Sequence, residues 1–584
     1  MFDTIIKGGS VVDGQGGRPF TADIGVKDGR IAEIGRLSTP AAEVIDADGL
    51  TVTPGFVDLH THYDGQIMWD DVLEPSFSHG VTTAIMGSCG VGFAPVRKGE
   101  ESVLIEIMQG TEDVPGDVLR AGVDFRWQTF PEYMDVLAER RLGMDVGAVL
   151  PHAALRPYVM GERGVHNEKA TTADLEALSR LVEEGLKAGA LGVSTSRIHQ
   201  HQATWGECIP GTFAELEELL ALARGLRGAG RGVYQVVPMG FVGSIGGDTS
   251  GEEVRTRELD FAIEVQKASG RPVIFTVLEF PEDLESWRRQ VSRIKSEADR
   301  GVDIYAQVST GAGQYIHGLQ GYHLFERRPS YRKLADLPLA ERAAEMRRPE
   351  VRAAILSEAD LPPDGPHLMD NQIDLIRSFF DLTYPLREPI VFEPDPDQSL
   401  LRLARSRGAA VEEILYDIYT ERDGTSFAVA ATDNYARGNL DVAYEMLRHP
   451  RTRIGLGDGG AHVRVICAAS YPTFNLQGWT RDRVRGPKIP IEFIVKKQSA
   501  DNARLFGLDD RGTLEIGKRA DINVIDMNRL RVGLPRMVQD FPAGGRRLIQ
   551  GATGYAATLV NGVATRRDDE DTGARPGRVV RRPS

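Results

Sequence analysis

The stretch Pro54-Gly-Phe-Val-Asp-Leu-His60-Thr-His62 decides our interpretation of this chain. Its apolar residues predict a buried β-strand, and the two histidines follow at the C-terminal end of that strand. Residues i and i+2 of a strand point to the same face, so His60 and His62 can hold one ion together. Barrel enzymes of the (β/α)8 type place their chemistry at the C-terminal ends of their strands. The stretch therefore predicts a metal site at the mouth of such a barrel.

The middle of the chain, from about residue 51 to residue 508, alternates short apolar runs with helical patterns. The seven further strand candidates are residues 82–86, 145–150, 191–193, 233–237, 272–275, 303–308 and 452–456. Residues 172–186 carry leucines at helical spacing behind a threonine that can cap a helix. Eight strand candidates alternating with helices predict an α/β fold, a (β/α)8 TIM-like barrel over residues 54–508.

The two ends of the chain differ from the middle because both consist of short β segments. Asp28-Gly29 and Asn561-Gly562 are hairpin signals, one at each end. Chain termini often lie close together, so residues 1–53 and 509–565 are predicted to form one small β-sandwich. The tail, residues 566–584, is charged and rich in Gly and Pro, and we expect it to be disordered.

A long insertion is predicted within the barrel, at about residues 311–423. This stretch is too long for a simple loop, and it contains the Pro-rich pieces 361–366 and 393–397. We expect it to act as a lid region that shapes the pocket at the barrel mouth.

Composition and charge limit the classes of protein to which this chain can belong. The 584 residues are 41% hydrophobic and 26% charged, which is typical of a globular protein, and the net charge is -15. An acidic surface repels phosphate groups, so we expect neither nucleic acid nor a membrane as a partner. Three widely separated cysteines form no disulfide framework. No signal peptide or membrane-spanning run is recognised, and we expect a cytoplasmic homo-oligomer.

Several motifs along nearly the whole chain are shared with one family. The chain resembles the amidohydrolase superfamily, and within it the D-aminoacylase (N-acyl-D-amino-acid deacylase) group. The matching stretches are residues 3–9, 12–14, 54–62, 79–83, 87–90, 155–161, 457–459, 502–507, 512–514 and 517–521. The resemblance implies a metal-bearing barrel with a β-sandwich made from both chain ends.

The resemblance also implies a metal site and a reaction. In similar deacylases the cysteine at the position of Cys89 is a zinc ligand, and a thiolate suits zinc. The aspartate at the position of Asp458 binds metal and carries the proton. The predicted ligands are therefore His60, His62, Asp458 and Cys89, holding one zinc ion or another divalent metal. Whether a lysine is carboxylated to bridge two metals is left open.

This sequence departs from the deacylase pattern at three positions near the ends of two predicted strands. Val237 and Val277 stand where the family has metal-binding histidines, and no histidine lies between His201 and His317. We therefore expect a reduced site with one ion. Glu279 replaces a lysine that meets the substrate carboxylate in similar deacylases. A glutamate there would repel a free carboxylate and favour a neutral or cationic substrate, or act as a general base.

The expected function is hydrolysis of the carbon–nitrogen bond of a small-molecule amide. Metal-activated water attacks the carbonyl, and Asp458 passes the proton to the leaving nitrogen. Glu279, His152 and His462 are candidate substrate contacts, and His199 and His201 are weaker candidates for a site role. Two alternatives stay open: hydrolysis of a cyclic amide, a lactone or an ester, and a metal-poor barrel that binds a small molecule without turnover.

Overall fold

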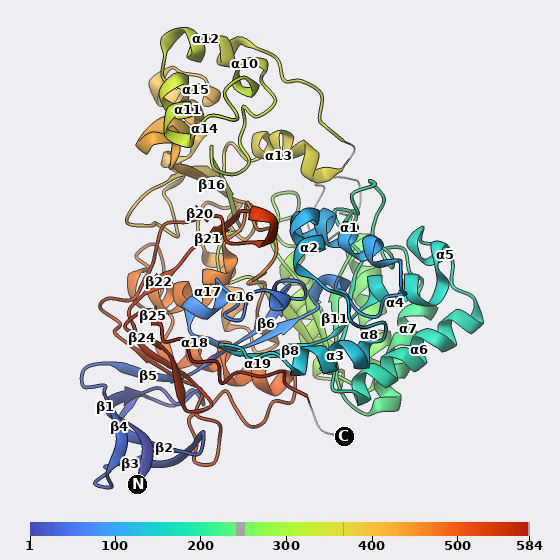
Figure 1. Ribbon diagram of the computed structural model, residues 1–584, viewed down its shortest axis with the longest axis vertical. Helices are drawn as coiled ribbons and strands as arrows, with labels where there is room; N and C mark the ends of the chain where they lie inside the picture. Colours follow the sequence, from blue (N-terminus) through green and yellow to red (C-terminus); the bar gives the residue numbers. More distant parts are fainter. Residues whose placement is uncertain (241–250, 366, 582–584) are drawn as a thin grey trace.

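The computed structural model describes residues 1–240, 251–365 and 367–581. Its middle consists of parallel strands in two sheets with helices around them, an α/β arrangement (Figure 1). The first sheet has the order β6-β7-β8, and the second has the order β17-β13-β12-β11-β10-β9. The bounds are β6 Phe56–Thr61, β7 Val81–Met86, β8 Asp145–Ala148, β9 Leu150–Pro151, β10 Gly192–Ser196, β11 Val233–Val237, β12 Val273–Thr276, β13 Ile304–Val308 and β17 Thr452–Ile454.

The two parallel sheets meet at both of their edges. Strands β8 and β9 are consecutive in the chain, separated by one residue, Val149. At the other edge, a parallel bridge joins Thr61 to Gly459, a few residues beyond β17. Over the described residues the strands are not joined into one continuous sheet. All eight predicted strand regions nevertheless contain strands.

Amphipathic helices cover the outside of the parallel strands. Helix α6 (Thr172–Lys187) begins at a capping box in which Thr171 and Asp174 bond each other's backbone. Its buried residues Leu178, Val182 and Leu186 recur every four positions, so they share one face. The other outer helices are α7 Leu216–Ala229, α8 Glu252–Ser269, α9 Ser286–Ala298, α16 Asp441–Arg448, α18 Ile491–Gln498 and α19 Ala500–Leu505. None of the helices in the described part of the chain has the length and apolar character to span a membrane.

Strands from both chain ends share one nine-stranded sheet. Its order is β25-β24-β23-β18-β5-β1-β2-β3, and β4 pairs with β1. Both expected hairpin turns are present, with positive φ at Asp28-Gly29 and at Asn561-Gly562, as a type I′ turn requires. The bounds are β1 Phe2–Val11, β2 Phe20–Lys27, β3 Arg30–Gly35, β4 Ala41–Asp46, β5 Thr51–Pro54, β18 Ile522–Ile525, β23 Tyr555–Val560, β24 Val563–Arg567 and β25 Glu570–Asp571.

The prediction of a disordered tail was wrong for residues 566–581. After β25, Val579 pairs in parallel with Val146 of β8, and the buried Val580 joins an apolar cluster under the parallel strands. The charged residues find partners as well: Arg575 lies 3.0 Å from Asp71, and Arg581 lies 2.7 Å from Asp135. The buried side chains of Val579 and Val580 therefore hold the charged tail against the parallel strands. Residues 582–584 lie outside the described residues.

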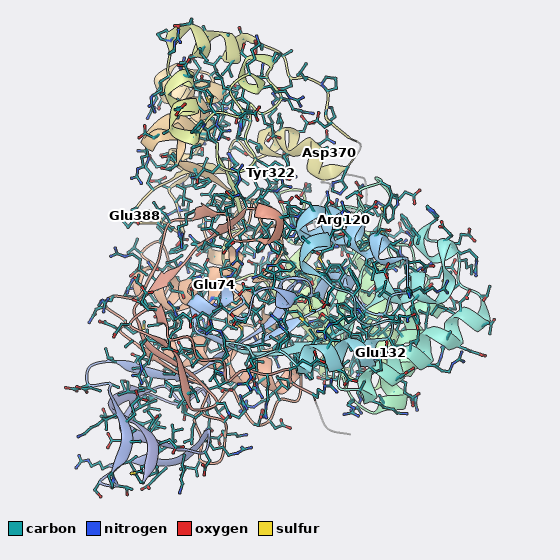
Figure 2. The ribbon with its side chains drawn as sticks, viewed as in Figure 1. Glu74, Arg120, Glu132, Tyr322, Asp370 and Glu388 are labelled. Atoms are coloured by element: carbon teal, nitrogen blue, oxygen red, sulfur yellow. The ribbon has the colours of Figure 1, made fainter. Side chains whose placement is uncertain are left out.

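The insertion forms a lobe with its own core. It carries the antiparallel sheet β14-β16-β15 and the helices α10 to α15, at the top of Figure 1. Buried aromatic residues such as Phe325, Tyr416 and Tyr419 form its core. Tyr322 lies where the lobe meets the rest of the molecule (Figure 2), and its hydroxyl donates to Asp113 at 2.9 Å. The bounds are β14 Gln314–His317, β15 Thr383–Leu386, β16 Phe427–Ala431, α10 Pro329–Arg332, α11 Leu339–Met346, α12 Pro349–Ser357, α13 Gln372–Ser378, α14 Leu400–Arg407 and α15 Val411–Thr420.

A buried ion-pair network connects the nine-stranded sheet to the parallel strands. Asp145, at the start of β8, lies 2.6 Å from Arg511 and 2.9 Å from Arg519. Arg519 also contacts Asp521 at 3.2 Å. All four side chains are at most 3% exposed, so the charges compensate one another away from water.

Replacing Asp145 with alanine should destabilise the protein by about 3–5 kcal/mol, because two buried guanidinium groups lose a partner. The measurement is the midpoint of urea unfolding with the metal content held constant. Asp124→Ala is the control, since its pair with Arg126 is exposed and should leave the midpoint unchanged. Equal midpoints for the Asp145 variant and the wild type would contradict the role of the network.

Candidate metal centre

The two histidines of the opening motif lie side by side at the end of β6. Their side chains are at most 2% exposed, and the ring centroids are 5.4 Å apart. The strand is buried along its whole length, so both rings are held by the packing of neighbouring strands. The backbone N–H of His62 donates to Gly459 at 2.8 Å and that of Asp458 donates to His60 at 3.2 Å. These bonds bring the segment after β17 next to the histidines.

Cys89 and Asp458 complete the predicted set. The Cys89 sulfur lies 3.3 Å from Nε2 of His60, and ligand atoms of His60, His62 and Cys89 all lie within 4.8 Å of one another. Oδ1 of Asp458 lies 3.3 Å from Nε2 of His60 and 3.8 Å from Nε2 of His62. The structure therefore brings together all four residues that the sequence indicated as ligands.

The backbone around these residues is unusual. Cys89, Leu456, Asp458 and His462 all have positive φ, between 46° and 62°. Residues with a Cβ rarely adopt this conformation, which costs about 1–3 kcal/mol each. Such strain gathers at functional sites, where the surrounding structure enforces it.

Two further residues lie at this site, Glu112 and His201. Glu112 ends helix α1 (Glu101–Glu112), and its carboxylate lies 3.5 Å from Nδ1 of His62. Ligand atoms of Cys89, Glu112 and His201 lie within 4.8 Å of one another. Sequence analysis did not identify Glu112 at all. A sequence pattern could have identified this residue. Ile105, Met108 and Glu112 stand at positions i, i+3 and i+7, a spacing that puts the glutamate on the buried face of the helix.

Unpartnered polar atoms show that a cation fits here. Both ring nitrogens of His62 and both carboxylate oxygens of Glu112 are buried without a hydrogen-bond partner. Buried polar groups without partners are costly, and a metal bound by these atoms would satisfy them. Imidazole, thiolate and carboxylate are all zinc ligands.

Burial sets the protonation of the site. It lowers the pKa of His60 to about 4 and that of His62 well below its usual value, so both rings are neutral, as metal ligands must be. Burial, with Glu112 and Asp458 nearby, raises the pKa of the Cys89 thiol. Burial, with Asp458 and Asp64, likewise raises the pKa of Glu112. The pKa of Asp458 is raised to about 7 by burial and by the carboxyl groups of Asp58 and Asp433. A cation binding here therefore competes with protons.

Gln307 holds the ring of His60 from behind. Its carboxamide lies 2.8 Å from Nδ1, the ring nitrogen that does not face Cys89 and Asp458. Partners of this kind fix the orientation of a ligating imidazole.

Replacing Gln307 with leucine should weaken metal affinity by about 10–100-fold, measured by competition with a chelator. Gln307→Glu, which keeps a hydrogen-bonding partner, is the control and should retain most of the affinity. An unchanged affinity in the leucine variant would contradict this role.

A cavity of about 260 Å³ opens onto the ligands. Asp458 is 20% exposed toward solvent, whereas the histidines are almost fully buried. The lining includes His60, Cys89, His201, Asp458 and His462, together with residues of the inserted lobe such as Tyr315 and Gln372. The lobe therefore forms part of the wall, which is the place predicted for the insertion. His462, a predicted substrate contact, lies at the cavity.

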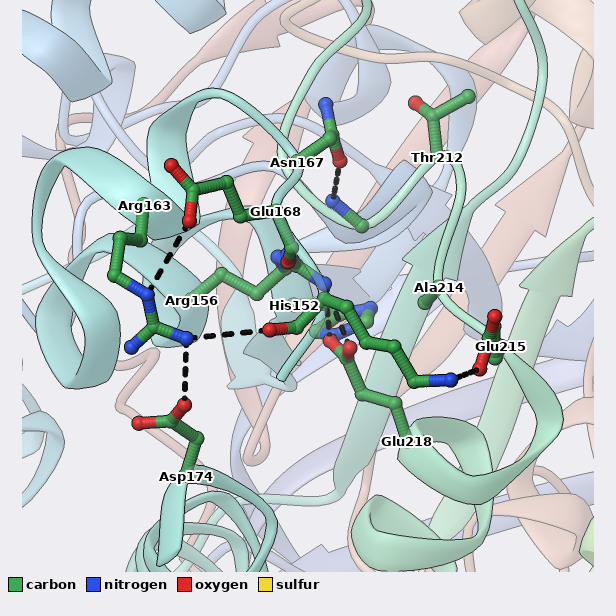
Figure 3. Close-up of polar contacts among 12 residues, drawn as sticks. His152, Arg156, Arg163, Asn167, Glu168, Asp174, Thr212, Ala214, Glu215 and Glu218 are labelled. Atoms are coloured by element: carbon green, nitrogen blue, oxygen red, sulfur yellow. Dashed lines mark hydrogen bonds and ion pairs between the residues drawn. The ribbon is translucent and has the colours of Figure 1, made fainter. Parts of the chain in front are cut away.

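The structure places His152, a predicted substrate contact, in a buried network away from the cavity. His152 is not among the residues that line the cavity, and Nδ1 lies 2.9 Å from the Thr195 hydroxyl. Nε2 lies 2.9 Å from Glu218 (Figure 3). Glu218 also pairs with Arg156 at 2.6 Å. Because both ring nitrogens already have buried partners, His152 belongs to a structural network between α4 (His152–Met160) and α7.

The structure also places Glu279, another predicted substrate contact, outside the lining of the cavity. Its side chain is fully buried, and one carboxylate oxygen lies 3.3 Å from Arg437. Asn434 accepts a hydrogen bond from the Glu279 backbone at 2.9 Å. The carboxylate therefore ties the end of β12 to residues 434–437. The neighbouring Leu278 takes the place on the cavity wall.

Histidine, thiolate and carboxylate ligands at the ends of parallel strands, beside a cavity, are typical of metal-dependent hydrolases. The profile of the Amidohydrolase family matches residues 43–565, and the chain belongs to this family.

Individual relatives cover different shares of the chain. An uncharacterized protein of Mycobacterium tuberculosis is 28% identical over 96% of this chain and 92% of its own length. The N-acyl-D-aspartate deacylase of Alcaligenes xylosoxydans xylosoxydans is 34% identical over 40% of this chain and 42% of its own length. The structure of N-acyl-D-glutamate deacylase from Bordetella bronchiseptica, complexed with zinc and a phosphonate inhibitor, has a TM-score of 0.63 at 22% identity, with both chains fully covered. That likeness in structure shows a shared fold.

Proposed function

We propose that this protein hydrolyses the carbon–nitrogen bond of a small-molecule amide at a zinc site held by His60, His62, Cys89 and Asp458. The observation that carries the proposal is the convergence of these four side chains, of which His60, Cys89 and Asp458 line one cavity. Membership of the amidohydrolase family and the deacylase activities named for its relatives support the amide as substrate.

We also propose how the strands are arranged into domains. The parallel strands close into one (β/α)8 barrel over residues 54–508, supported by the contacts at both edges of the two sheets. The strands of the two chain ends form the β-sandwich domain, supported by their common sheet. The lobe then stands over the C-terminal ends of the barrel strands, where barrel enzymes bind substrate.

The protein residues have separate tasks in the reaction. Zinc, when bound, polarises a carbonyl and makes water a better nucleophile at neutral pH. His60 and His62 hold their neutral rings toward the site, and Asp458 reaches from the site into the cavity. Asp458 accepts the proton from the attacking water and gives it to the leaving nitrogen. A carbon–oxygen bond forms, the carbon–nitrogen bond breaks, and the products are a carboxylic acid and an amine.

The cavity favours a substrate without a free carboxylate. Among the described residues that line it, none is a lysine or an arginine. Val237, Leu278, Leu375, Val465 and Ile466 give it apolar walls. Asp433 also lines it, and Oδ2 of this buried carboxyl group has no hydrogen-bond partner. An N–H group of the substrate can supply that partner, whereas a carboxylate would meet like charge.

The test compares two matched series of N-acyl compounds, one with neutral amine components and one with D-aspartate. We expect kcat/KM to be about 100-fold or more higher for the neutral series, because burying an unpaired charge costs several kcal/mol. Linear and cyclic amides are included in the neutral series. Faster hydrolysis of N-acyl-D-aspartate would contradict the proposed substrate class, and no hydrolysis of any amide would contradict the proposed activity.

A further inference from the structure

We infer that a second cavity, between the inserted lobe and the rest of the molecule, binds a small anion that carries a carboxylate or phosphate group. This cavity has a volume of about 770 Å³, and Tyr322 and Asp370 mark two points of its wall (Figure 2). Over the described residues, its lining shares no member with that of the cavity beside His60. The inference therefore goes beyond the proposed function.

Arg327 is a buried cation of the lobe whose charge is not compensated. It lines the cavity and is only 6% exposed. Its Nε is buried without a hydrogen-bond partner, and no carboxylate in the described part of the chain lies within 4 Å of its guanidinium nitrogens. A buried charge without a partner is costly, and an anion in the cavity would supply that partner.

Arg342 is a second cation of the lobe in the same cavity. Its guanidinium donates to the Tyr331 hydroxyl at 2.9 Å and to the carbonyl oxygens of Leu319 and Ala335, each at 3.2 Å. These partners are neutral, its Nε has no hydrogen-bond partner, and again no described carboxylate lies within 4 Å. Guanidinium groups bind carboxylate and phosphate through paired hydrogen bonds, so two of them in one cavity favour an anion.

The acidic side chains of the cavity leave both of these arginines uncompensated. Asp113 pairs with Arg464, and Asp364 lies 3.1 Å from Arg332, so these two carboxylates already have cationic partners. Glu326 also lines the cavity, and burial raises its pKa to about 7. A carboxyl group that is protonated near neutral pH can donate a hydrogen bond to an anion instead of repelling it.

The test titrates the full, zinc-loaded chain with inorganic phosphate and, separately, with succinate in a calorimeter. We expect the wild type to bind at least one of them with a Kd below about 1 mM, and the tighter one identifies the anionic group. Arg327→Gln and Arg342→Gln should each raise that Kd by about 10-fold or more, because each removes charge-assisted hydrogen bonds. Arg348→Gln is the matched control and should leave the Kd unchanged, since Arg348 is an exposed lobe residue that pairs with Glu345 outside the cavity.

Glu326→Gln tests the sign of the charge that the cavity accepts. The variant removes a group that can carry negative charge, so the anion should bind at least as tightly as it binds to the wild type. Weaker binding would indicate a cationic ligand and overturn the inference. No binding of either anion to the wild type would overturn it as well. An unchanged Kd in both Arg327→Gln and Arg342→Gln would place the anion elsewhere, such as on the catalytic zinc, with the same consequence. Circular dichroism melting shows whether each variant is folded.

Discussion

Replacing Asp458 with asparagine should lower kcat by about 10²–10⁴-fold, the range expected when a positioned acid–base group is lost. The amide keeps an oxygen in place of Oδ1, which lies 3.3 Å from His60, but it cannot accept and return a proton. We therefore expect the variant to retain zinc while losing turnover. The measurement combines kcat with elemental analysis of the same preparation.

A second aspartate at the cavity provides the control for this prediction. Asp433 lines the same cavity, but the structure records no contact between its carboxyl group and the two metal-binding histidines. Asp433→Asn should therefore change KM more than kcat. Equal kcat in Asp458→Asn and the wild type would rule out proton transfer by Asp458, and zinc loss in the variant would mean that Asp458 acts chiefly as a ligand.

The positions of the strands and of the first ligands could be predicted because both follow from local pattern. His60 and His62 stand two residues apart on an apolar strand, so their common direction is fixed by the geometry of the strand. Asp458 and Cys89 follow strands as well, and the carboxyl ends of parallel strands converge.

The remainder of the site depends on contacts between segments far apart in the sequence. Glu112 comes from a helix and His201 from the segment after β10, and neither follows a strand end directly. Glu279 does follow a strand, but its carboxylate contacts Arg437, 158 residues away in the sequence, and does not line the cavity. The position of His152 likewise depends on a distant residue, since Glu218 on a later helix contacts its ring. No local sequence pattern predicts these contacts between distant residues.

Removing the metal should abolish hydrolysis reversibly in the wild type. We expect chelated protein to lose at least about 10³-fold in kcat/KM, because the main source of carbonyl polarisation and water activation is gone. Zinc should restore the wild type but not His60→Ala, His62→Ala, in which the two buried nitrogen ligands are missing. His166→Ala, an exposed histidine paired with Glu207, is the control and should regain full activity.

The outcomes of zinc addition separate the two classes of function that the sequence left open. His60, His62 and Asp458 lie together beside the cavity, and buried unpartnered nitrogens such as those of His62 are costly without a cation. A barrel that only binds a small molecule has no physical need for this arrangement. Zinc-dependent recovery of hydrolysis in the wild type alone would therefore establish that His60 and His62 hold a catalytic ion. A wild type that binds no zinc, yet still binds amides without turnover, would contradict the hydrolase and favour the binding protein.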